Sequence, residues 1–160
     1  GSVIKGHYSD GVNNPEAYPL SGMGAANVGP EFTITEYMGL MELERLEKQY
    51  FNQGKIPRCS EIGKVLYNAV VQSGRWKKWL LPGESADDFE KIQTERKAWL
   101  VSSGCRYIWQ NAEVLASRAQ LYDNFAGNGI LAEEIVLSKI EQAMDNYFNA
   151  FNLKNLNDLL

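Results

Sequence analysis

From residue 33 onward, apolar side chains recur every three or four positions, which is the period of an amphipathic helix. This pattern predicts a helix from Thr33 or Thr35 to about Phe51, which is closed by Gly54. Four further helices are predicted, over 60–74, 85–101, 111–127 and 131–151. We therefore expect residues 33–155 to be mostly helical.

Residues 1–30 follow a different pattern, in which short apolar runs give way to Gly, Asn, Ser and Pro. This pattern predicts two short strands, Val3–Lys5 and Ala25–Val28. His7 follows the first strand, and Gly29-Pro30 follows the second and leads into the long helix. Strands that open into polar, glycine-rich loops are typical of the active-site rim of a (β/α) barrel.

The predicted fold class is therefore α/β: the C-terminal portion of a TIM-type (β/α) barrel, with about two strands, followed by a mostly α-helical extension. We expect residues 1–52 to form the last βα units and residues 53–160 to form the extension. With 160 residues the chain is too short for a complete barrel, which needs about 250. We therefore expect the remaining strands to lie on another segment or another chain.

Composition excludes several classes of function. The net charge is −4 and no basic face is evident, which argues against a nucleic-acid partner. No apolar run approaches the roughly 20 residues that span a bilayer, so no membrane partner is expected. Cys59 and Cys105 lie far apart without a CxxC pair, which is typical of structural thiols in a reducing, cytoplasmic setting.

His7 is the only histidine in the chain, and it directly follows a predicted strand. A neutral imidazole is a good ligand for zinc-like ions, so His7 is the candidate metal ligand, although a structural histidine is the alternative. Asp10 is a candidate catalytic residue. It has three possible roles: it can bind the metal, orient His7 through the ring N–H, or only form a turn. Asn27 is the second catalytic candidate, as a carboxamide donor to a substrate hydroxyl or as a turn residue.

Small residues in the same loops are candidates for substrate binding through their backbone N–H groups. They are Ser9, Gly11, Gly22, Gly24 and Gly29. The start of the following helix would add its dipole to such an anion site. Glycine in loops also supplies positive φ without any ligand, and Glu31 argues against a phosphate at this position.

The four tryptophans are expected to serve packing, and Arg106 has two possible roles. Arg106 precedes a predicted helix, so it can reach back to the site as an anion-binding arm or pin the extension to the barrel. Of these two roles, the pinning role is the prediction.

Two pairs of motifs carry a resemblance to known families. His7-x-x-x-Gly11, followed by Gly22–Val28, resembles the end of a class II, metal-dependent sugar-bisphosphate aldolase barrel. Val28–Thr33 and Cys105–Trp109 resemble the tagatose-bisphosphate aldolase accessory (non-catalytic) subunit family. The resemblance implies a divalent metal at His7, zinc or alternatively manganese, and places Asn27 beside a substrate phosphate.

The predicted function is thus part of a metal-dependent ketose (tagatose-type) aldolase or sugar epimerase that acts through a metal-stabilised enediolate. The alternative is a non-catalytic subunit that stabilises a partner tagatose-bisphosphate aldolase through its helical surface. Expected partners are a sugar or sugar-phosphate substrate and the remaining barrel segment or an aldolase subunit, in a homo- or hetero-oligomer. Because the chain has no second histidine, the metal ligand set within it is incomplete.

Overall fold

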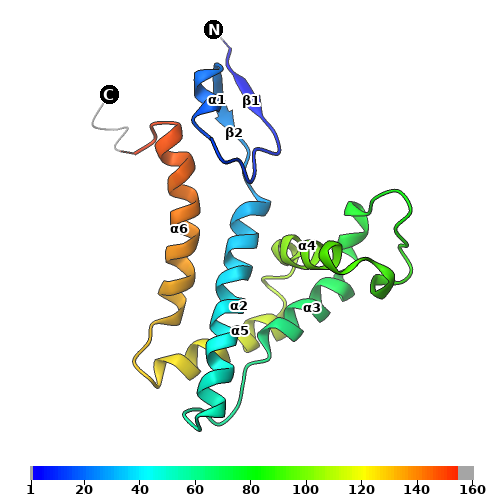
Figure 1. Ribbon diagram of the computed structural model, residues 1–160, viewed down its shortest axis with the longest axis vertical. Helices are drawn as coiled ribbons and strands as arrows, with labels where there is room; N and C mark the ends of the chain where they lie inside the picture. Colours follow the sequence, from blue (N-terminus) through cyan, green and yellow to red (C-terminus); the bar gives the residue numbers. More distant parts are fainter. Residues whose placement is uncertain (1, 155–160) are drawn as a thin grey trace.

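The computed structural model describes residues 2–154, and these are mostly helical (Figure 1). In chain order the elements are β1 (Ile4–Gly6), α1 (Ala17–Leu20), β2 (Met23–Ala26), α2 (Pro30–Asn52), α3 (Ile62–Ser73), the short 3₁₀ helices η1 (Arg75–Trp79) and η2 (Phe89–Lys91), α4 (Thr94–Gly104), η3 (Cys105–Tyr107), α5 (Ala112–Ala126) and α6 (Ala132–Ala150).

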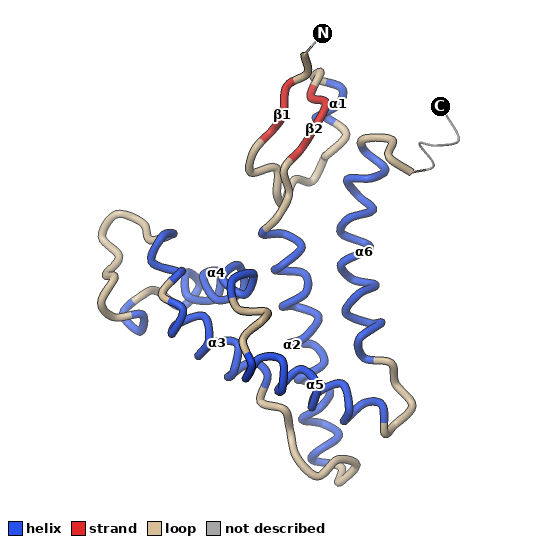
Figure 2. The backbone as a smooth tube through the Cα atoms, turned by 180° about the vertical axis from the view of Figure 1, so that it is seen from behind, coloured by secondary structure: helices blue, strands red, loops and turns tan. Residues whose placement is uncertain are grey.

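Helix α2 is the centre of the structure. Figures 1 and 2 show α6 running alongside α2, whereas α3 and α4 lie on the other side. Leu40 and Leu43 of α2 are almost wholly buried, since they belong to the apolar stripe that the sequence period predicts. They pack in one core with side chains of α3, α5 and α6, among them Leu66, Val70, Val114, Leu121, Phe125 and Val136.

A second, smaller core lies between η1, η2 and α4. Its buried members are Trp76, Phe89, Ile92, Leu100 and Val101. The rings of Trp76 and Phe89 meet edge to face, with centroids 4.8 Å apart. This core fixes the segment between α3 and α4, which carries Trp79 and leads to Arg106.

A fully buried carboxylate joins α2 to the loop before α3 and to α5. Glu47 Oε1 accepts hydrogen bonds from Ser60 N at 2.9 Å and from Asn124 Nδ2 at 2.6 Å. Glu47 Oε2 accepts a third bond, from Ser60 Oγ at 2.8 Å. Burial removes water from these oxygens, and three protein donors replace it.

The predicted barrel portion is wrong. β1 and β2 pair in parallel, but the sheet of the described residues has only these two strands, with 62% helix and 5% strand overall. Val3 and Ile4 are largely exposed, so no layer of helices covers the sheet as in a barrel. The helices instead enclose cores of their own. A short apolar run that ends in a polar loop describes any strand end and does not specify a barrel.

Several element boundaries differ from the sequence prediction. α2 begins at Pro30, ahead of Thr33, because proline suits the first turn of a helix. α4 begins at Thr94 and not near Ser85, since Asp88 caps the short helix η2 by accepting a bond from Glu90 N. α2 shares its core with helices beyond residue 52, and residues 155–160 of the predicted extension lie outside the described part. In the described part, no helix is both long and apolar enough to cross a membrane.

Replacing Glu47 with alanine should lower the free energy of unfolding by about 3 kcal/mol, because buried donors of Ser60 and Asn124 lose their acceptor. The matched control is Glu42→Ala, which removes an exposed acid of the same helix that pairs with Lys139. Its effect should be small. Urea unfolding followed by circular dichroism measures both, and equal losses for the two variants would contradict the account of the buried carboxylate.

Candidate functional site

The loops that follow β1 and β2 meet beside the start of α2 and border a cleft of about 230 Å³. Ser9 N donates to Asn27 O at 3.1 Å, and Asn27 N donates to Gly6 O at 3.0 Å, so backbone bonds hold the two loops together. Among the residues that line the cleft are His7, Tyr8, Asp10, Asn27, Gly29 and Arg106. The structure therefore brings His7, Asp10 and Asn27 to one cleft.

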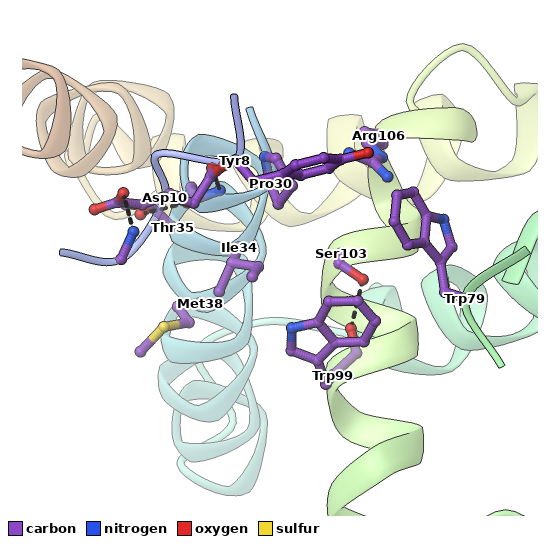
Figure 3. Close-up of a pocket in the computed structure, with 12 residues that line it drawn as sticks. Tyr8, Asp10, Pro30, Ile34, Thr35, Met38, Trp79, Trp99, Ser103 and Arg106 are labelled. Carbon is purple, nitrogen blue, oxygen red and sulfur yellow. Dashed lines mark hydrogen bonds between the residues drawn. The ribbon is translucent and has the colours of Figure 1, made fainter. Parts of the chain in front are cut away.

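Tyr8 has an unusual backbone conformation. Its φ is 57°, in the left-handed region, which costs a bulky L-residue about 1–2 kcal/mol. Its side chain is 79% exposed, so burial of the ring does not offset this cost. The strained turn directs the ring over Pro30 and its hydroxyl end toward Arg106 (Figure 3). Strain of this kind concentrates at ligand sites.

Asp10 caps α2 from outside the helix. Its Oδ1 accepts hydrogen bonds from Gly29 N and Glu31 N, both at 2.9 Å. Gly29 has no side chain to cap the helix itself, so Asp10 supplies the acceptor that an N-terminus needs. The backbone amides at the start of α2 thus bind a carboxylate of the chain itself, that of Asp10. Of the three roles that the sequence leaves open to Asp10, these contacts come nearest to the turn-former, because its carboxylate binds backbone amides.

Glu31 and Tyr147 complete the junction. Glu31 Oε2 accepts from Gly11 N at 2.7 Å, so the loop and the helix start bind each other reciprocally. The Tyr147 hydroxyl of α6 donates to Glu31 Oε2 and lies 3.1 Å from Ser9 O. Burial, followed by the bond to Glu31, raises the pKa of Tyr147 well above its usual range, so the phenol keeps its proton. The sequence places Tyr147 within the predicted helix 131–151 and does not indicate this junction.

The small residues predicted to bind substrate lie in different places. Ser9 is buried, and its backbone serves the junction. Gly11 has φ 67° and donates its N–H to Glu31, while the N–H of Gly29 is bonded to Asp10. Gly22 lies in the turn before β2 and Gly24 lies within β2, and neither residue lines the cleft. A cradle of backbone N–H groups for phosphate is therefore not formed by these glycines together.

Arg106, for which the sequence favours the pinning role, lies at the cleft in the structure. It belongs to η3, far along the chain from His7, and it lines the same cleft. Its guanidinium carbon lies 4.9 Å from the centroid of the Trp79 ring and 4.7 Å from that of Tyr107. Its Nε is buried and has no hydrogen-bond partner among the described residues. Arg106 thus contributes a positive charge to the cleft, as the alternative role of an anion-binding arm requires.

A larger cavity of about 510 Å³ adjoins the cleft and shares Tyr8, Asp10, Pro30 and Arg106 with it. Its remaining wall is mostly apolar and comes from α2, η1 and α4, with Trp79 and Trp99 as the largest side chains (Figure 3). The Trp79 and Trp99 rings meet edge to face at 6.4 Å. The tryptophans that were expected only to pack therefore also border an open space.

The described residues do not by themselves fit a resident metal centre. Within residues 2–154, no group of three or more His, Cys, Asp or Glu side chains is placed to hold a metal ion. His7 shares the cleft with one carboxylate, that of Asp10, and one oxygen of that carboxylate already accepts two backbone bonds. Further ligands would have to come from outside these residues.

Neither a protein-family model, a curated protein sequence nor a solved structure matches the chain. The resemblance to the aldolase families therefore stays a prediction. The function has to be argued from the cleft, its charge and the junction that positions it.

Replacing Asp10 with alanine should loosen the junction, because the amides of Gly29 and Glu31 lose their acceptor. We expect a loss of about 1 kcal/mol of stability and faster hydrogen exchange at these two amides. Asp10→Asn keeps an oxygen at the capping position and should retain most of the protection. Unchanged exchange in the alanine variant would show that Asp10 does not hold the loop.

Proposed function

We propose that this chain binds a sugar phosphate at the cleft between the N-terminal loops and Arg106. The observation that carries the proposal is that Arg106 lines the same cleft as His7 and Asn27. None of the ion pairs among the described residues includes Arg106, so its charge is available to a ligand anion. A guanidinium binds phosphate in a planar, bidentate manner.

The other cleft residues suit the hydroxyl groups of a sugar. The Asn27 carboxamide offers donors and an acceptor, the His7 imidazole offers ring nitrogens that form hydrogen bonds, and the Tyr8 hydroxyl both donates and accepts. All three side chains are exposed to solvent, so a ligand can reach them. A volume of about 230 Å³ limits the bound part to a small molecule.

In this proposal the chain serves carbohydrate metabolism as a non-catalytic subunit of a sugar-phosphate enzyme. The resemblance of Val28–Thr33 and Cys105–Trp109 to an aldolase accessory subunit supports this role. A cytoplasmic location is part of this proposal, and it is supported by the two free thiols, Cys59 and Cys105. An oligomer with an aldolase subunit would provide the reaction centre.

A second candidate is that His7 supplies one ligand of a divalent metal in a ketose aldolase or epimerase. The observation that favours it is the exposed position of His7 on the same cleft as Asn27. Because the described residues lack the other ligands, a partner chain or further segment would have to supply them.

Arg106→Gln should weaken binding of fructose 6-phosphate by about ten- to a hundredfold, since it removes one charge-assisted interaction of about 1.5–3 kcal/mol. The control Arg45→Gln removes an exposed charge of α2 outside the cleft and should bind as the parent does. Isothermal titration calorimetry measures both variants, with fructose as the uncharged comparison. Equal affinity of the Arg106 variant and the parent would refute the site.

Metal analysis distinguishes the two candidates. If His7 is a ligand, the natural assembly should contain a stoichiometric divalent metal that is lost in His7→Ala while helical content stays unchanged, because His7 is exposed. Asn27→Ala should leave the metal in place. A metal-free assembly that still binds the sugar phosphate would support the non-catalytic role and exclude the second candidate.

A further inference from the structure

The larger cavity beside the cleft has the features of a ligand pocket. Its volume of about 510 Å³ lies within the range of small-molecule sites, about 300–1,000 Å³. Figure 3 shows Ile34 and Met38 of α2 on one side and Trp99 and Trp79 on the other. Met38 and Trp99 are 63% and 39% exposed, so apolar surface faces this space without a covering side chain among the described residues.

The aromatic wall is held in place before any ligand binds. The Arg96 guanidinium lies 4.7 Å from the Trp99 ring centroid, and its Nη2 donates to the backbone oxygen of Trp79. Arg96 Nε forms an ion pair with Glu84 at 3.1 Å, which fixes the guanidinium in turn. A ligand therefore meets tryptophan rings that need little ordering, which reduces the entropic cost of binding.

Two buried donors at this wall lack acceptors. Trp79 Nε1 and Arg106 Nε are both buried, and neither has a hydrogen-bond partner within residues 2–154. Buried donors are satisfied in nearly all native structures, by protein, water or ligand. Arg106 also borders the smaller cleft, so one guanidinium faces both spaces.

Asp10 lies away from Arg106, and both acidic side chains of the cavity are already hydrogen-bonded within the protein. Figure 3 shows Asp10 and Arg106 at opposite ends of the space. Asp10 Oδ1 is bonded to two backbone amides, and Glu31 Oε2 accepts from Gly11 N and Tyr147. The aromatic end of the cavity therefore carries positive charge, and its electrostatics favour an anion there.

We propose that the cavity between α2 and α4 binds the planar aromatic group of an anionic ligand whose charge is held by Arg106. The aromatic ring lies against Trp79 and Trp99, and Ile34 and Met38 cover its other side. This inference rests on the proposed function only in sharing Arg106 as the anion anchor. It adds a second part to the ligand, an apolar ring beyond the anion.

The test compares phenyl phosphate with inorganic phosphate and phenol, each titrated into the full chain by calorimetry. Phenyl phosphate should bind at least tenfold more tightly than either, because it alone engages both the ring site and Arg106. Trp99→Ala should abolish the advantage of phenyl phosphate over inorganic phosphate and leave the weaker phosphate affinity unchanged. Met38→Ala removes a largely exposed side chain and should reduce the advantage at least twofold.

Phe51→Ala, which truncates an exposed aromatic residue at the far end of α2, is the matched control and should retain the full advantage. Equal affinities for phenyl phosphate and inorganic phosphate in the parent chain would overturn this inference, even if fructose 6-phosphate binds through Arg106. Tight binding of phenyl phosphate without any binding of fructose 6-phosphate would support it and refute the proposed function. If Trp99→Ala and Met38→Ala both keep the full advantage, the ring does not bind in this cavity.

Discussion

The position of the N-terminal segment depends on one polar junction, formed by Asp10, Glu31 and Tyr147. The two-stranded sheet has exposed Val3 and Ile4, and a sheet of this size is not stable alone. Apolar burial of this segment is modest: Pro15 is buried, and the half-buried Tyr18 ring lies 6.5 Å from the Phe151 ring. Instead, Asp10 caps α2, Glu31 accepts from the loop, and Tyr147 ties both to α6. Since hydrogen bonds are directional, the junction sets the orientation of the loops as well as their attachment.

This orientation creates the cleft. The junction holds the loop that carries His7 and Tyr8. This loop borders the same cleft as Arg106, which belongs to η3, directly after α4. The second core, around Trp76 and Phe89, steadies the segment that supports Arg106. The polar cleft and the aromatic cavity then share one guanidinium between them. A single cation between a polar and an apolar space favours a ligand that has an anion next to a less polar group.

The sequence predicts the helices well where the apolar period is strong, as around Leu40 and Leu43 in α2, because one buried stripe determines both pattern and packing. It also predicts the two parallel strands, but it does not predict the size of their sheet, since two strand ends do not define a barrel. His7 and Asn27 reach one cleft through local loop chemistry. For Arg106 the local pattern leaves two roles open, and for Tyr147 it indicates only a position in a helix. Their places in the structure come from contacts across roughly a hundred residues or more.

Nuclear magnetic resonance of the isotopically labelled chain, titrated with fructose 6-phosphate, tests the central claim most directly. The claim is that the two N-terminal loops and Arg106 form one ligand site. It predicts that the largest chemical-shift changes occur together at the amides of Asn27 and Gly29 and at Nε of Arg106, with a single dissociation constant. Saturating ligand that leaves the Arg106 signal unmoved, or shifts confined to surfaces away from the cleft, would contradict the claim.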